Sequence, residues 1–81
     1  MILSTIAPEP PKTRVVVDGN KVSFVSPYPD QWFVEDLTKE VPPAMRRWDH
    51  RTSTWTVPVE YLGFLVELVK VSFGREPEII R

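Results

Sequence analysis

The stretch MRRWDHRTSTWTVP, residues 45–58, places two tryptophans seven residues apart around a polar segment and is predicted to form a β-hairpin. If residues 50–53 form a four-residue turn, Trp48 lies opposite Trp55, and both rings share one face with Val57. The other face is then formed by the alternate residues Arg47, Asp49, Thr54 and Thr56. Because a cross-strand aromatic pair stabilises a hairpin and burial of each ring stabilises it further, we expect both tryptophans to pack in the core against a helix. An exposed platform that stacks on nucleic-acid bases is the alternative.

Before this hairpin, the sequence predicts a first hairpin and a helix. Residues 14–26 place Asp18-Gly19-Asn20 between two runs rich in β-branched residues, and both Asp-Gly and Gly-Asn fit a two-residue turn there. A helix is expected after Asp30, a residue type that caps helix N-termini, and Pro42-Pro43 ends it. Its apolar residues recur at helical spacing and are expected to face the core: Trp32, Phe33, Leu37 and Val41.

After the second hairpin, the chain is predicted to form a second helix over residues 59–73, which Gly74 ends. Residues 76–80 are long enough to add a short last strand. At the other end of the chain, three closely spaced prolines predict an extended or disordered arm over residues 1–12. The order β-β-α-β-β-α, with the C-terminal strand as an addition, predicts a single α+β domain over residues 13–81.

The second predicted helix is unusually apolar. From Tyr61 to Phe73, nine of thirteen residues are apolar, and the polar positions form one narrow stripe. A helix with this pattern is buried on most sides, yet a small domain has few elements to cover it. We therefore expect either the N-terminal arm or a second copy of the chain to pack against its remaining flank.

Length and composition exclude several classes of protein. Eighty-one residues make one domain with a small core. With no cysteine and one histidine, the chain has no disulfide or thiolate metal site and is poorly suited to zinc, so we expect no metal and no cofactor. The N-terminus lacks the basic segment of a signal peptide, and no apolar run reaches the roughly 20 residues that span a membrane. We expect a complete, cytoplasmic gene product with a net charge of −1, which leaves room for a local basic patch.

The second hairpin and its flanks resemble the HARP domain and related substrate-recognition segments found beside Swi/Snf-type helicase motors. The resemblance covers roughly residues 22–66 and is carried by a helix ending in proline, followed by R-W-D-x-x-T-x-x-W-x-V-P and another helix. The matching residues are Tyr28, Pro29, Arg47, Trp48, Asp49, Thr52, Trp55, Val57, Pro58 and Tyr61. The resemblance implies recognition of branched or junction DNA as an accessory to an ATP-driven motor. No phosphate-binding G-x-x-x-x-G-K-[ST] motif is present, and the first predicted helix is acidic where the family pattern often carries lysine.

One basic cluster stands out around the second hairpin, offset only by Asp49: Arg46, Arg47, His50 and Arg51. This cluster would suit a patch that contacts phosphates, and an ordinary solvated hairpin face is the alternative. Catalysis is disfavoured, because His50 lies in a loop without a positioned nucleophile and the carboxylates show no acid–base spacing. We therefore expect a protein that is not an enzyme.

Two functions from different classes follow. The first is a small, non-catalytic module that binds DNA through the polar face of the second hairpin. The alternative is an interaction or assembly module, of a kind that would suit a phage or mobile element, which dimerises or binds a host protein through the apolar second helix. A basic stripe that continues from Arg47 to Arg51 and includes Lys21 or Arg14 would favour DNA, whereas an isolated cluster would favour protein contact.

Overall fold

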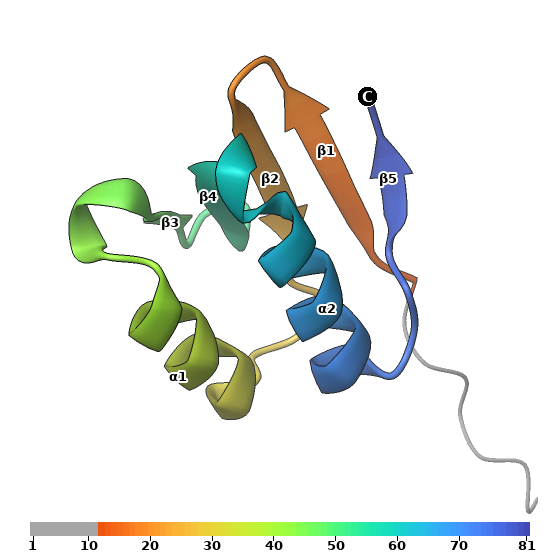
Figure 1. The fold of residues 1–81 in the computed structure, drawn as a ribbon. Helices are drawn as coiled ribbons and strands as arrows, with labels where there is room; N and C mark the ends of the chain where they lie inside the picture. The colour runs from red at the N-terminus through yellow and green to blue at the C-terminus, as the bar shows by residue number, and fades with distance from the viewer. Residues whose placement is uncertain (1–11) are drawn as a thin grey trace, which may run out of the picture.

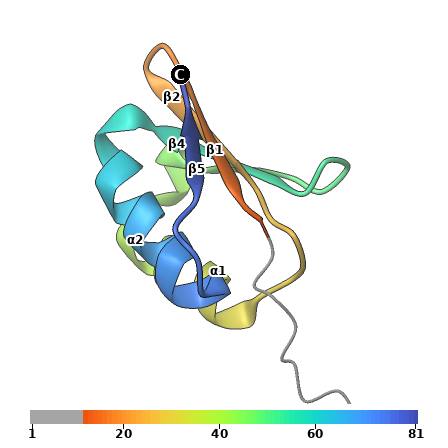
Figure 2. The ribbon, with the colours of Figure 1, turned by 90° about the vertical axis from the view of Figure 1, so that its right-hand side faces the viewer.

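In the computed structural model, which describes residues 12–81, one mixed five-stranded sheet carries both α-helices on the same face (Figures 1 and 2). The elements follow in the order β1 (Arg14–Asp18), β2 (Lys21–Val25), α1 (Gln31–Glu40), β3 (Arg47–Asp49), β4 (Thr54–Pro58), α2 (Leu62–Phe73) and β5 (Glu78–Ile80). Short 3₁₀ turns at Pro43–Met45 and Val59–Tyr61 precede β3 and α2. The predicted α+β domain with a C-terminal strand is confirmed. The predicted arm, residues 1–12, lies outside the described residues apart from Lys12.

The sheet order is β3-β4-β2-β1-β5, so the two hairpins lie side by side and are joined through β2 and β4. All neighbouring strands are antiparallel except β1 and β5, which run parallel. In the first hairpin, β1 ends at Asp18 and β2 begins at Lys21, so Gly19 and Asn20 form the turn. Gly19 has a φ of 63°, and a positive φ at the first turn residue alone fits a type II′ hairpin. Of the two predicted turns, Asp-Gly and Gly-Asn, the structure therefore contains Gly-Asn.

The second hairpin has the predicted register. Trp48 pairs with Trp55, and Asp49 pairs with Thr54, which leaves residues 50–53 as the four-residue turn. The two indole rings lie 4.9 Å apart between centroids. Trp55 is buried at 8% exposure, whereas Trp48 is 42% exposed. Trp55 is therefore a core residue, as predicted. Trp48 faces the same side but is only partly covered, because β3 is an edge strand with a neighbour on one side only.

Helix α1 begins where its cap predicts. The side chain of Asp30 accepts a hydrogen bond of 3.0 Å from the backbone N–H of Phe33. Phe33, Leu37 and Val41 are buried, but Trp32 is 75% exposed, so its predicted place in the core is wrong. The three buried residues are spaced by four and form one stripe, whereas Trp32 lies one residue earlier and points about 100° away from that stripe.

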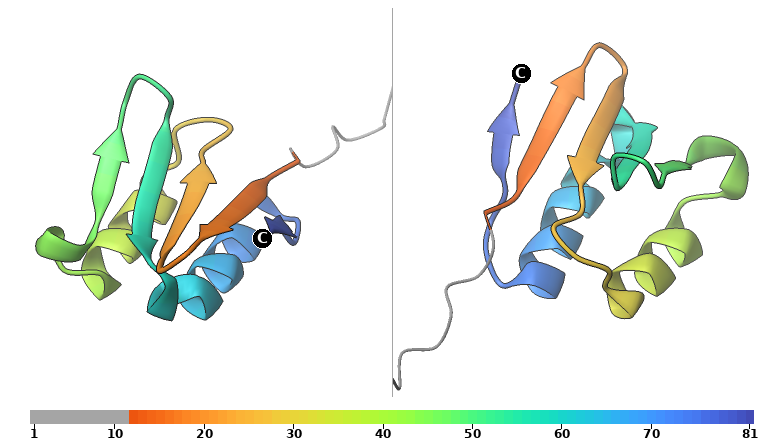
Figure 3. Two further views of the ribbon diagram at one scale, coloured as in Figure 1. Left: turned by 90° about the horizontal axis from the view of Figure 1, so that it is seen from above. Right: turned by 180° about the vertical axis from the view of Figure 1, so that it is seen from behind.

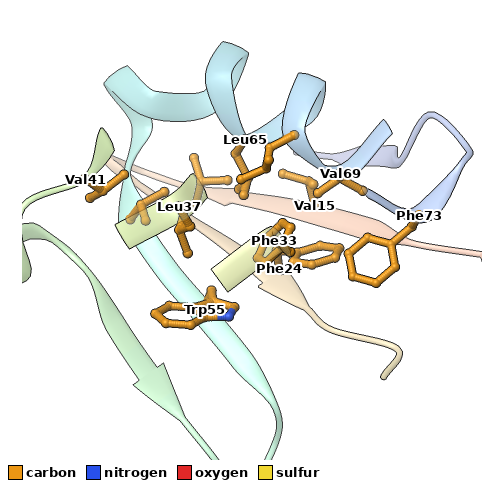
Figure 4. Close-up of a cluster of buried hydrophobic side chains, with 12 residues drawn as sticks. Val15, Phe24, Phe33, Leu37, Val41, Trp55, Leu65, Val69 and Phe73 are labelled. Carbon is orange, nitrogen blue, oxygen red and sulfur yellow. The ribbon is translucent and has the colours of Figure 1, made fainter. Parts of the chain in front are cut away.

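The core lies between the sheet and the two helices (Figure 4). The rings of Phe24, Phe33 and Phe73 bring together β2, α1 and the end of α2, with centroids 5.2–5.7 Å apart. Leu65 and Val69 of α2 are fully buried in the same cluster. Three elements distant in sequence are therefore held by one group of aromatic contacts.

Helix α2 follows its 3₁₀ turn and ends at Gly74, whose φ of 76° and N–H bond to the Lys70 carbonyl form the predicted stop. Its buried residues are Leu65, Leu68, Val69 and Phe73. Of its large apolar side chains, Val71 is exposed, at 77%. The sheet and α1 cover its four buried residues, whereas Leu62, Phe64 and Val66 are half-buried. Packing of the N-terminal arm or a second copy against the remaining flank stays a prediction. None of the helices in residues 12–81 has the length and apolar character needed to cross a membrane.

The two differently placed tryptophans predict different stability effects. Trp55→Ala removes a buried ring and is expected to lower the free energy of unfolding by about 3–5 kcal/mol, as core truncations of this size do. Trp32→Ala removes an exposed ring and should change it by no more than about 0.5 kcal/mol. Urea denaturation of the two variants measures both values. A Trp55→Ala loss no larger than that of Trp32→Ala would contradict the placement of Trp55 in the core.

The cap at Asp30 generates a second prediction. Asp30→Ala is expected to lower the free energy of unfolding by about 1 kcal/mol, because the N–H of Phe33 loses its acceptor. Asp30→Asn keeps an amide oxygen in the same place and should behave like the wild type, since asparagine caps helices as well as aspartate. Denaturation of both variants checks the cap; equal losses would mean that the charge, and not the hydrogen bond, supports α1.

Candidate nucleic-acid interface

The face of the sheet opposite the helices is left open by the described residues, as the view from behind shows (Figure 3, right). Alternate residues of each strand point to this face, and the strand register brings those of β1, β2, β3 and β4 together. They are Arg14, Val16, Asp18, Lys21, Ser23, Val25, Arg47, Asp49, Thr54 and Thr56. None of these residues is aromatic. The open face therefore offers charges and hydroxyl groups to a ligand, and no rings on which bases would stack.

A shallow hollow of about 650 Å³ lies at one end of this face, where β2 and β4 meet the segment before β3. We call it the basic hollow. Three cationic side chains line it, Lys21, Arg46 and Arg47, together with the hydroxyl-bearing Ser23 and Thr56. No carboxylate belongs to its lining among the described residues. In a protein of net charge −1, this is a local concentration of positive charge.

Hydrogen bonds hold the wall of the basic hollow in place. The guanidinium of Arg46 donates to the backbone carbonyls of Val41, at 2.5 Å, and Thr38, at 3.4 Å, near the end of α1. The Tyr61 hydroxyl donates to the sulfur of Met45 at 3.8 Å. These contacts fix the segment between α1 and β3, and they place the charge of Arg46 before any ligand arrives. A guanidinium has five donors, so Arg46 keeps others for an anion.

The structure divides the predicted basic cluster into two parts. Arg46 and Arg47 join Lys21 at the basic hollow, whereas His50 and Arg51 lie exposed at the hairpin turn. That turn projects away from the helices (Figure 2). Asp49 separates the two parts along β3, and its carboxylate accepts the backbone N–H of Arg51 at 2.9 Å. The positive charge does not form one continuous stripe from Arg47 to Arg51, although Lys21 does extend it in the other direction. The charge pattern that was expected to favour DNA is therefore met only in part, at the end where Lys21 joins Arg47.

Comparison of the chain with protein-family models, curated proteins and solved structures finds no match. The resemblance to the HARP domain stays a prediction from the residues that carry it.

The chemistry of the basic hollow is electrostatic. Its lining has cations and hydroxyl donors suited to an anion such as a phosphate group. The described residues hold no group of three histidine, cysteine or acidic side chains placed to bind a metal ion. Ser23 and Thr56 had no signal of their own in the sequence, because they reach the hollow only through the pairing of β2 with β4. That pairing joins strands about thirty residues apart, with a helix between them.

The two neighbouring arginines are predicted to differ in their effect on stability. Arg46→Ala removes the hydrogen bonds to the end of α1 and should lower the free energy of unfolding by about 1.5–2 kcal/mol. This is the lower part of the range for hydrogen bonds with a charged donor, because the side chain is half-buried. Arg47→Ala removes an exposed side chain from the open face and should change it by no more than about 0.5 kcal/mol. Thermal denaturation compares them; the reverse order of losses would contradict the structural role of Arg46.

Proposed function

We propose that this protein is a small, non-catalytic module that binds nucleic acid by contacting phosphates at the basic hollow. The observation that carries the proposal is the convergence of Lys21, Arg46 and Arg47 on one concave site, in whose lining residues 12–81 place no carboxylate. Such a site attracts a polyanion locally even when the net charge of the protein is slightly negative. Three cations suffice for a weak, salt-sensitive interaction and not for a tight one.

The composition of the open face favours contacts to the backbone over contacts to bases. Single-stranded nucleic acid is usually held by aromatic side chains on which bases stack, and the open face has none. We therefore expect a preference for duplex or junction DNA with little sequence specificity. The resemblance to the HARP domain points in the same direction. The turn over residues 50–53, which carries His50 and Arg51, projects away from the helices (Figure 2) and would approach a ligand on the open face.

The test is a binding assay by electrophoretic mobility shift and fluorescence anisotropy on single-stranded, duplex and forked DNA at low and moderate salt. The wild type is expected to bind duplex and forked DNA at low salt and to lose affinity as salt rises. Lys21→Gln combined with Arg47→Gln should weaken binding and reduce the salt slope on duplex DNA by about 1.8, which is about 0.9 for each of two lost phosphate contacts. Neither side chain is buried, so the fold should be kept.

The matched control is Lys12→Gln combined with Lys70→Gln, which removes the same charge from exposed positions outside the basic hollow. This control should bind nearly as the wild type does. Equal weakening by the two pairs would mean that net charge, and not the basic hollow, governs binding. If the wild type binds none of the three DNA forms at low salt, the proposed function is wrong.

A further inference from the structure

A second concavity, of about 630 Å³, lies on the other side of the β3–β4 hairpin, facing the start of α1 and the segment that precedes it. We call it the aromatic groove. Its apolar lining comes from the segment before α1, the first turn of α1 and the β3–β4 hairpin: Pro27, Tyr28 and Pro29, Phe33 and Val34, Trp48 and Trp55. Nothing in the nucleic-acid proposal uses this surface.

Two large rings of the aromatic groove are exposed and yet held in place. Trp48 is 42% exposed, but one side of its ring packs on the buried Trp55. Tyr28 is 46% exposed, and its ring lies edge-on to the buried Phe73 with centroids 5.1 Å apart. Rings that are already fixed lose little conformational freedom when a ligand binds, so the entropic cost of binding is low. Exposed apolar surface that is concave and preformed often marks an interaction site.

The charge of the aromatic groove is opposite to that of the basic hollow. Its charged lining consists of Asp30 and Glu35, and no cationic side chain of the described residues belongs to it. Asp30 uses one oxygen to cap α1, and Glu35 accepts a hydrogen bond of 3.3 Å from the Gln31 side chain. Both carboxylates keep further acceptor capacity. A nucleic acid is therefore disfavoured here, whereas a cationic group is attracted.

The backbone around the aromatic groove offers few free donors. Pro27 and Pro29 have no N–H, and the N–H of Ser26 is bonded to the Ser53 carbonyl. The N–H groups of Phe33 and Val34 are bonded to Asp30. Apart from the outer edge of β3, which pairs with β4 alone, an occupant that needs backbone hydrogen bonds from the groove would find few donors. A proline-rich polyproline II segment has less need of them, because its prolines have no N–H and its rings pack against aromatic walls.

We propose that the aromatic groove binds a proline-rich segment of a partner protein that carries an arginine. The prolines pack between Tyr28 and Trp48, and the guanidinium reaches the carboxylates of Asp30 and Glu35. Arginine fits this place better than lysine, because its planar group both stacks on an indole face and pairs with carboxylates. The module thereby carries two binding surfaces of opposite charge on the two sides of one hairpin.

The test is a titration of the full-length, ¹⁵N-labelled protein with a synthetic proline-rich peptide containing one arginine, followed by NMR. The indole N–H of Trp48 and the backbone N–H groups of Tyr28 and Val34 are expected to shift. A peptide with glutamine in place of the arginine, and one with alanine in place of the prolines, should each bind more weakly. Asp30→Asn combined with Glu35→Gln keeps the cap and the side-chain acceptor but removes both charges, and should weaken binding by about five- to tenfold.

The matched control is Asp36→Asn combined with Glu40→Gln, which removes two exposed charges of α1 that do not line the aromatic groove. It should bind the arginine peptide within about twofold of the wild type, because distant surface charges are screened by salt. Equal weakening by the two pairs, or equal binding of the arginine and glutamine peptides, would overturn the proposal. So would shifts that map outside the aromatic groove, or no shifts at all.

Two other occupants give distinct results without any peptide. Concentration-dependent shifts of Trp48 and Tyr28 would identify a second copy of the chain. Shifts of the same resonances on replacing Pro8, Pro10 and Pro11 by serine would identify the chain's own N-terminal segment. Either result would overturn the proposal of a partner protein. The outcome is independent of the nucleic-acid assay, because the peptide and the DNA are predicted to use different surfaces and residues.

Discussion

The packing of Trp48 on Trp55 determines where the surfaces of this protein lie. Trp55 belongs to the core, and the 4.9 Å contact between the rings extends that core outward to the edge strand β3. Because Trp48 faces the helices and neighbouring strand residues point to opposite sides, Arg47 and Asp49 lie on the open face. One apolar contact therefore separates a cationic surface from an anionic, aromatic one across a strand of three residues.

The small core explains why so few contacts have such wide effects. Phe24, Phe33 and Phe73 join the sheet, α1 and α2 in one aromatic group. Phe73 of this group also contacts the exposed ring of Tyr28, which lies between β2 and α1. A chain of 81 residues buries a modest share of its surface, so its surface residues lie close to the core. The two proposed binding surfaces therefore lie directly beside the core.

Local sequence signals predicted the local structure well. Gly19 at the first turn, Asp30 at the start of α1, Gly74 at the end of α2 and the facing tryptophans each act over a few residues, and each is found where the pattern indicates. The errors arise where several apolar residues compete for one buried place, as Trp32 does with Phe33, or where burial depends on a neighbouring strand that an edge lacks, as at Trp48. The convergence of Lys21 with Arg46 and Arg47 depends on the long-range pairing of β2 with β4, for which the local sequence carries no signal.

The shortness of β3 has a consequence for the dynamics of the protein. Within the described residues, β3 pairs with β4 alone, so its outer edge has backbone groups that no other strand satisfies. We expect a strand of this kind to open by local unfolding at a lower free energy than β1 and β2, and its amide hydrogens to exchange faster. Because Arg47 and Trp48 are consecutive residues of β3, each such opening would dismantle both surfaces at once while the rest of the sheet stays folded. Ligands on either side would slow that exchange, and each would thereby favour the binding of the other without any contact between them.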